Sequence, residues 1–143
     1  MKLQFDLPYP PSVNHYWRRV GARTLISRQG RAFRESVCSL LALRRLRPLE
    51  GPLIIEVDVC PPDHRRRDID NLLKSLLDAL EAAGVYHDDS QIVELTIRKL
   101  QPVVDGQTRV RIEEVPDSMT QTNALPETRQ ASGQDNRRKL GND

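Results

Sequence analysis

The chain has 143 residues, of which 38% are hydrophobic and 29% are charged. This length favours one compact domain, since domains usually hold roughly 100 to 200 residues. No apolar run approaches the roughly 20 residues that cross a bilayer, and the first residues form no apolar signal segment, so we expect a cytoplasmic protein without membrane contact. The 2 cysteines cannot form a disulfide framework, and we expect both thiols to be reduced.

Charge is unevenly distributed along the chain, although the net charge is only +2. Residues 1–50 carry ten Lys or Arg against three Asp or Glu, whereas residues 51–116 carry eight against thirteen. A basic surface beside an acidic cluster suits a protein that holds a polyanion together with divalent cations. The same pattern also fits two solvated faces of opposite sign.

The first part of the chain is typical of strands followed by a helix. Residues 3–7 alternate apolar and polar side chains, which predicts a strand that the following prolines end. Residues 23–26 are expected to form a second, short strand, and Ser27 is placed to cap the helix that follows. The apolar side of this helix carries Phe33, Val37, Leu40 and Leu41. Its other side is rich in arginine, with Arg31, Arg34, Arg44 and Arg45.

The second part of the chain contains the strongest helical pattern. Residues 53–59 alternate as a strand, and apolar residues then recur at helical spacing from about 69 to 83. Residues 93–97 and 110–112 predict two further strands, with a two-residue hairpin signal at Asp105-Gly106 before the returning strand.

These elements predict an α+β domain over residues 1–116, in which a small mixed β-sheet packs with two main helices. Residues 117–143 lack apolar periodicity and are expected to form a disordered polar tail. There is no internal repeat, which agrees with a single folded domain.

The candidate chemistry lies where the strand of residues 53–59 gives way to the long helix. Asp68 and Asp70 stand two apart at the helix start, so both carboxylates can converge on one ion while the residue between them points to the core. Paired carboxylate oxygens suit Mg²⁺. The arginines of residues 65–67 and the helix N-terminus attract phosphate, and Lys74 lies one turn beyond Asp70 on the same face.

A metal site of this kind needs a third acid, and Asp88 and Asp89 are the candidates. They follow the helix C-terminus, one helix length of roughly 20 Å from Asp68. Convergence therefore requires the turn to run back along the sheet, or the next strand to deliver Asp89 near the helix start. Each feature also has a purely structural interpretation: Asp68 as a helix cap, Asp70 as a complement to the helix dipole, and the Asp88-Asp89 pair as turn residues.

Three separated motifs occur in order along the chain. Residues 7–14 are rich in proline, residues 66–72 with Lys74 contain an Asp-x-Asp-Asn motif, and residues 84–92 contain the Asp-Asp pair. At this spacing they resemble the RusA-type Holliday junction resolvases, which are endodeoxyribonucleases of bacteria and their prophages. The resemblance spans about residues 1–116 and includes the segment Asp78-Ala79-Leu80.

The resemblance implies roles for particular residues. Mg²⁺ is expected as the cofactor, held by Asp68, Asp70 and Asp89, and these three acids are expected to be catalytic together with Lys74. With the arginine loop included, the residues expected to contact DNA are Asn14, Arg66, Arg67 and Lys74.

The resemblance further implies a homodimer that resolves four-way DNA junctions by paired nicks during recombination and repair. A two-fold junction calls for a two-fold enzyme with one active site per protomer, which agrees with this expectation. Two other functions stay open from the residues themselves. One is a non-catalytic protein that binds branched DNA, and the other is a small metal-dependent nucleotide phosphatase.

Overall fold

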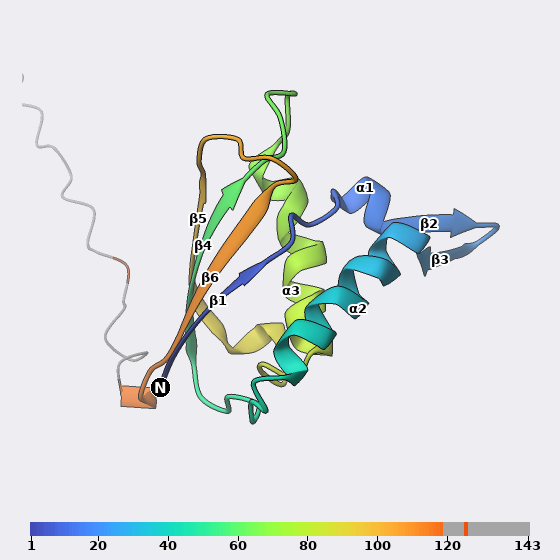
Figure 1. Cartoon of the computed structure of the whole chain (residues 1–143). Helices are drawn as coiled ribbons and strands as arrows, with labels where there is room; N and C mark the ends of the chain where they lie inside the picture. Colours follow the sequence, from blue (N-terminus) through green and yellow to red (C-terminus); the bar gives the residue numbers. More distant parts are fainter. Residues whose placement is uncertain (119–124, 126–143) are drawn as a thin grey trace, which may run out of the picture.

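Four strands form the main sheet of the computed structural model (Figure 1), which describes residues 1–118 and residue 125. The strands are β1 (Lys2–Leu7), β4 (Leu53–Cys60), β5 (Ile92–Lys99) and β6 (Gln107–Glu114), in the spatial order β1-β6-β4-β5. Strands β4 and β5 run parallel, whereas the other neighbours are antiparallel. The expected mixed sheet is therefore confirmed.

Two helices cover one face of this sheet (Figure 1) and enclose the core. They are α2 (Arg28–Ala42) and α3 (Leu73–Ala82). Strand β4 lies between β5 and β6, and its alternate side chains Leu53, Ile55, Val57 and Val59 are fully buried. The α+β class with two main helices is thus as predicted. Within the described residues no helix is both long and apolar enough to cross a bilayer.

The prediction that a hairpin at Asp105-Gly106 pairs the two flanking strands is wrong. Both residues adopt positive φ angles, of 66° and 72°, as a tight turn requires, but β5 and β6 do not pair. The connection instead passes the end of β4, where the Leu100 amide donates to the Val59 carbonyl at 2.8 Å and the Val103 amide donates to the Pro61 carbonyl at 2.9 Å. Strand β6 therefore enters between β1 and β4, and β5 is left at the edge of the sheet.

The long helix expected from residue 69 is divided into two parts. It begins with the 3₁₀ turn η1 (Ile69–Leu72) and continues as α3, which ends at Ala82. A tighter turn at a helix N-terminus is common and changes where the first side chains point. The tail expected over residues 117–143 lies outside the described residues from 119 onward, except for residue 125.

A separate two-stranded sheet projects from the body of the molecule (Figure 1). The short helix α1 (Val13–Tyr16) leads into β2 (Trp17–Val20), which pairs antiparallel with β3 (Arg23–Ile26). The strand predicted for residues 23–26 is therefore confirmed. Helix α2 approaches the base of this arm so closely that a Cβ at Gly30 would lie 2.5 Å from the Tyr16 carbonyl oxygen, which only glycine avoids.

Helix α2 begins as predicted, with Ser27 as its N-cap. The Ser27 hydroxyl accepts a hydrogen bond from the Gly30 amide at 2.9 Å and donates to the His15 carbonyl. The expected apolar side is correct for three of its four residues, but Leu40 is 45% exposed. The arginine-rich side is also only partly correct, since Arg34 turns toward α3 and Arg44 packs over the Phe5 ring.

Replacing Ser27 with Ala is expected to lower the free energy of unfolding by about 1 kcal/mol, because an unsatisfied helix N-terminus costs about that much. Chemical denaturation of the purified variant measures the change. Ser39→Ala is the matched control, since Ser39 lies exposed in the last turn of α2 and should change stability by less than about 0.5 kcal/mol. Equal stability of the two variants would show that the Ser27 cap does not contribute.

Candidate active site

The loop between β4 and η1 is held in shape by Asp63. Its carboxylate accepts from the Arg67 guanidinium at 2.6 Å and from the Arg65 amide at 2.9 Å. These two hydrogen bonds lower the pKa of Asp63 to about 2, and the bond from Arg67 has the larger effect. The Arg67 guanidinium also lies over the Tyr9 ring, 5.9 Å from its centroid. Arg67 therefore fastens this loop to the proline-rich segment, a structural role that the sequence did not indicate.

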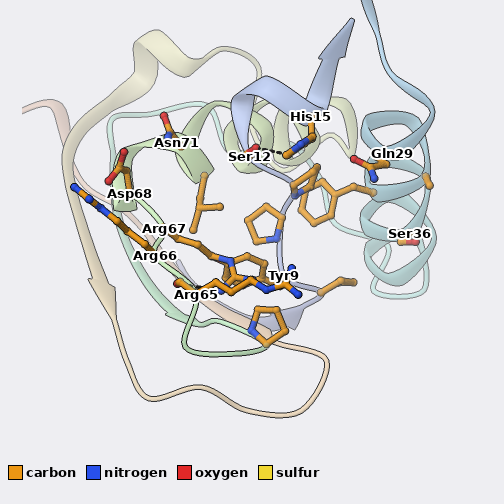
Figure 2. A pocket seen from close by; sticks show the side chains of 17 residues that line it. Tyr9, Ser12, His15, Gln29, Ser36, Arg65, Arg66, Arg67, Asp68 and Asn71 are labelled. Carbon is orange, nitrogen blue, oxygen red and sulfur yellow. Dashed lines mark hydrogen bonds between the residues drawn. The ribbon is translucent and has the colours of Figure 1, made fainter.

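A groove of about 910 Å³ opens between this loop, the proline-rich segment and the first half of α2. Figure 2 shows Arg66 and Asp68 on one side of it, with Gln29 and Ser36 of α2 on the opposite side. Its polar lining also includes His15, whose Nδ1 lies 2.7 Å from the Ser12 hydroxyl. The groove thus brings the proline-rich motif and the Asp-x-Asp-Asn motif together, although more than fifty residues separate them.

Asp68 and Asp70 are exposed beside this groove, and neither is engaged by another side chain. Asp68 occupies the N-cap position of η1, but its side chain makes no capping hydrogen bond. Among residues 1–118 neither carboxylate has an ion-pair or hydrogen-bond partner. Asp68 therefore does not act as a helix cap, and both side chains carry carboxylate oxygens of the kind that Mg²⁺ prefers.

The structure separates the roles of Asp88 and Asp89. Asp88 caps the 3₁₀ turn η2 (Asp89–Gln91): its carboxylate accepts from the Ser90 amide at 3.1 Å, and the Gln91 side chain accepts from the Asp88 amide at 2.9 Å. Asp89 instead accepts from the Tyr86 hydroxyl at 2.9 Å through one oxygen. Each of the two acids therefore uses one carboxylate oxygen in these bonds, Asp88 to cap the turn and Asp89 to accept from Tyr86.

A single chain does not bring the three expected acids together. Within the described part of the chain, no three acidic, histidine or cysteine side chains are close enough to share a metal ion. The Tyr86 hydroxyl, which holds Asp89, also lies 2.9 Å from the Leu77 carbonyl, midway along α3. Asp70 precedes Leu77 by about 12 Å of helix, at roughly 1.5 to 2.0 Å per residue. Asp68 and Asp70 therefore lie at one end of α3, and Asp89 lies beside its second half.

Two further expected residues lie at the surface. Lys74 is exposed in the first turn of α3 and forms no ion pair with Asp70 in the described structure, so its ammonium is available to an anion. Asn14 is exposed in α1, next to the residues that line the groove. Arg66 is exposed and has no acidic partner among the described residues, unlike Arg67.

The sequence did not predict a part-buried polar network formed by Asp78, Tyr16 and Arg34. The Asp78 carboxylate accepts from the Tyr16 hydroxyl and, at 2.6 Å, from the Arg34 guanidinium. Burial acts to raise the pKa of Asp78, but these hydrogen bonds outweigh it and hold the pKa below its usual value. Burial and the bond to Asp78 raise the pKa of Tyr16 to about 12. The network ties the projecting arm to α2 and α3, and the Asp78-Ala79-Leu80 motif was its only signal.

The fold and the groove define a small α+β protein that presents free carboxylates and basic side chains together, as proteins that act on phosphate esters do. The sequence profile of the family Endodeoxyribonuclease RusA matches residues 8–113. The chain belongs to this RusA family.

Several relatives share most of their length with this chain. A crossover junction endodeoxyribonuclease rusA of Enterobacteria phage HK97 is 41% identical over 113 residues, which cover 78% of this chain and 94% of that protein. The protein of the same name from Escherichia coli K12 is 38% identical over 110 residues, covering 76% of this chain and 92% of the relative. That of Enterobacteria phage 82 is 39% identical with the same coverage, 76% and 92%.

Proposed function

We propose that this protein is a Mg²⁺-dependent endonuclease that hydrolyses phosphodiester bonds in four-way DNA junctions and resolves them by paired nicks. The observation that carries the proposal is the pair of uncommitted carboxylates, Asp68 and Asp70, beside an arginine-bordered groove. Relatives named crossover junction endodeoxyribonuclease support branched DNA as the substrate. Such a reaction belongs to DNA recombination and repair.

The donor set fits the metal. Asp68, Asp70 and Asp89 offer hard carboxylate oxygens, and we propose that these three residues hold Mg²⁺ in a homodimer, because one chain alone does not bring them together. When bound, the ion supplies Lewis-acid charge, which lowers the pKa of a coordinated water and stabilises negative charge on the phosphate. The Tyr86 hydroxyl holds one oxygen of Asp89, which fixes the direction in which the other oxygen points.

Basic side chains position the DNA in this proposal. Arg66 is free to bind a backbone phosphate, and Lys74 stabilises the negative charge that develops on the scissile phosphate. Arg67 keeps the loop in place through Asp63 and Tyr9, which leaves its neighbours Arg66 and Asp68 correctly directed. Asn14, on the proline-rich side, is placed to contact the sugar-phosphate backbone.

A cleavage assay tests the proposed function. The purified protein is given Mg²⁺ and one of three substrates: a four-way junction, a linear duplex of the same sequence, or free nucleotides. We expect paired nicks in the junction and little reaction with the other two. Release of phosphate from nucleotides would indicate a phosphatase, and junction binding without cutting would indicate a non-catalytic binding protein. Either outcome would contradict the proposal.

Replacing Arg66 with Ala is expected to weaken junction binding and to flatten its salt dependence. Each lost phosphate contact removes about 0.9 from the slope of log affinity against log salt concentration on duplex DNA. Binding titrations at several salt concentrations measure the slope. The free energy of unfolding should change by less than about 0.5 kcal/mol, since Arg66 is exposed.

Arg47→Ala is the matched control for this measurement. Arg47 is also an exposed arginine, but it precedes β4 and so lies at the opposite end of that strand from the Arg66 loop. Its removal should leave the salt slope close to that of the wild type. Equal slopes for the Arg66→Ala variant and the wild type would show that the loop does not contact phosphate.

A further inference from the structure

The arm formed by β2 and β3, residues 17–26, stands away from the rest of the molecule (Figure 1). All residues of β2 except the first, and all residues of β3 except the last, are exposed. An isolated pair of strands is only marginally stable in water, so such an element depends on the body that carries it. The arm therefore offers surface to a ligand and contributes little to the core.

The base of the arm is nevertheless held firmly. Trp17 and Ile26 lie opposite each other at the base and pack against the core. The Tyr16 ring meets the Trp17 ring edge-on, with 5.0 Å between the centroids, and the Tyr16 hydroxyl donates to Asp78. On the other strand, the Ser27 amide donates to the Tyr16 carbonyl at 2.7 Å. Both strands are thus fixed where they leave the body, so the arm points in a set direction.

Positive charge is concentrated in and beside this arm. Residues 7–34 contain six arginines and neither Asp nor Glu. Arg34 pairs with Asp78, whereas the other five arginines are exposed and form no ion pair within residues 1–118. These five are Arg18, Arg19, Arg23, Arg28 and Arg31. Because like charges close together repel one another, this surface is matched to a strongly negative partner.

One face of the arm combines arginines with apolar side chains. In the antiparallel register Arg18 lies opposite Leu25, and Val20 lies opposite Arg23. Because side chains alternate along a strand, these four share one face, which we call the outer face. Val20 is 50% exposed and Leu25 is 40% exposed. The half-buried Trp17 belongs to the other face, so the outer face is turned to solvent.

The dimensions and chemistry of the arm fit double-stranded DNA. A two-stranded ribbon, whose strands are about 4.8 Å apart, fits the major groove of about 12 Å with its side chains, but not the minor groove of about 6 Å. Arginines bind the phosphates at the groove edges, and apolar side chains contact the thymine methyl groups inside it. DNA is favoured over an anionic membrane or an acidic peptide because the chain belongs to an endodeoxyribonuclease family.

The arm also begins at the groove beside Asp68, without being part of it. Strand β2 starts two residues after His15, and β3 ends three residues before Gln29, and both of these residues line that groove. None of residues 17–26 lines it. A strand of four residues extends about 13 Å, which corresponds to about four base pairs along DNA. A double helix that reaches the groove would therefore continue past the arm.

We propose that the arm is a second DNA-binding site, separate from the groove beside Asp68, and that it lies in the major groove of a double-helical branch of the junction. Arg18 and Arg23 bind backbone phosphates, while Val20 and Leu25 face the bases. The arm holds the branch beside the cleavage site and takes no part in the chemistry. This inference rests on the proposed function only in that DNA is the ligand.

Salt titrations of binding test the arm without using activity. The double variant Arg18→Ala/Arg23→Ala is compared with the wild type on a four-way junction and on a linear duplex, without Mg²⁺. Loss of two phosphate contacts should reduce the slope of log affinity against log salt concentration by about 1.8. Over a fourfold rise in salt concentration, the affinity of the variant should therefore fall about tenfold less than that of the wild type. A slope equal to that of the wild type overturns the proposal.

Two further variants serve as controls. Arg45→Ala/Arg47→Ala removes two exposed arginines that follow α2 at the end away from the arm, and it should keep the wild-type slope. Arg18→Lys/Arg23→Lys retains the charge and should also keep it. The denaturation midpoint of the Arg18→Ala/Arg23→Ala variant should equal that of the wild type, because both arginines are exposed. A slope that falls equally in the alanine and lysine variants would contradict a phosphate contact.

DNA modified in the major groove tests where the arm lies. Glucosylated 5-hydroxymethylcytosine places a sugar in the major groove, where it would exclude the ribbon. We expect this modification to weaken duplex binding by the wild type and to have a smaller effect on the Arg18→Ala/Arg23→Ala variant. Equal weakening of both proteins would show that the arm does not occupy the major groove.

Cutting separates this inference from the proposed function. If the wild type does not cut junctions but its salt slope depends on Arg18 and Arg23, the proposed function fails and the arm remains a DNA site. If the wild type cuts and the slope is independent of both arginines, the arm proposal fails alone. At protein concentrations that saturate the junction, the Arg18→Ala/Arg23→Ala variant should cut at the wild-type rate. A slower rate at saturation would contradict an arm that takes no part in the chemistry.

Vesicles that contain phosphatidylserine test the competing partner. We expect the wild type and the Arg18→Ala/Arg23→Ala variant to bind such vesicles equally weakly. Vesicle binding that requires both arginines, together with an unchanged salt slope on DNA, would assign the arm to a membrane surface and overturn the proposal.

Discussion

Asp70→Asn is expected to reduce Mg²⁺-dependent junction cutting by about 10²-fold or more, which is the usual cost of removing one group that stabilises the transition state. Junction affinity should hold or rise, because the substitution removes a negative charge close to DNA phosphates. Single-turnover cleavage and a binding titration without Mg²⁺ measure the two effects separately. A large loss of cutting with affinity retained would assign Asp70 to the reaction and not to folding.

Glu35→Gln is the matched control for this substitution. Glu35 is exposed on α2 and does not line the groove, so its replacement removes the same charge without touching the proposed site. Cutting by this variant should equal that of the wild type. An Asp70→Asn variant that cuts at nearly the wild-type rate would remove Asp70 from the catalytic set. Loss of affinity together with cutting would instead indicate that Asp70 stabilises the start of η1.

Asp78→Asn is expected to lower the free energy of unfolding by about 2 kcal/mol at pH 7, because hydrogen bonds to a charged group contribute about 1.5 to 3 kcal/mol. The substitution removes the charge that Tyr16 and Arg34 both address. Chemical denaturation at pH 7 measures the difference from the wild type. The Glu35→Gln variant again serves as the control and should differ by less than about 0.5 kcal/mol.

The pH dependence of this difference has a definite sign. Because the pKa of Asp78 is lower in the folded protein than in the unfolded chain, the ionised carboxylate stabilises the fold above the unfolded value of about 3.8. This contribution is lost as the pH falls through the lower, folded pKa. The wild type and Asp78→Asn should therefore converge in stability below about pH 3.8. A difference that stays constant into acid would show that the Asp78 charge does not stabilise the network.

Local elements could be predicted because their signals lie within a few residues. The alternation in residues 53–59, the helical spacing after Ile69 and the cap at Ser27 each depend on neighbours along the chain, and each element formed nearly where it was expected. The candidate residues Asp68, Asp70 and Arg66 were equally accessible to sequence reasoning. These three residues lie within one short segment, so their charges and spacing can be read directly from the sequence.

Contacts between distant segments could not be predicted in the same way. The Asp105-Gly106 turn looks the same whether it joins neighbouring strands or carries the chain past the end of β4, and only the packing of β6 between β1 and β4 distinguishes the two. Arg34 had the spacing of a solvated helix face, yet it pairs with Asp78, which is 44 residues away in sequence. A side chain's partner depends on which elements meet, and the local pattern does not specify that.

The sequence by itself determined the α+β class, the identity of the acidic and basic candidates and the resemblance to the RusA family, because each is written in local periodicity or in short motifs. Only the tertiary structure decided that Arg67 holds its loop through Asp63, that Asp88 caps a 3₁₀ turn, and that β5 lies at an edge of the sheet. It also placed Asp89 away from Asp68. Asp89 comes before β5 and Asp68 comes after β4, and because these two strands are parallel, the two residues lie at opposite ends of the sheet.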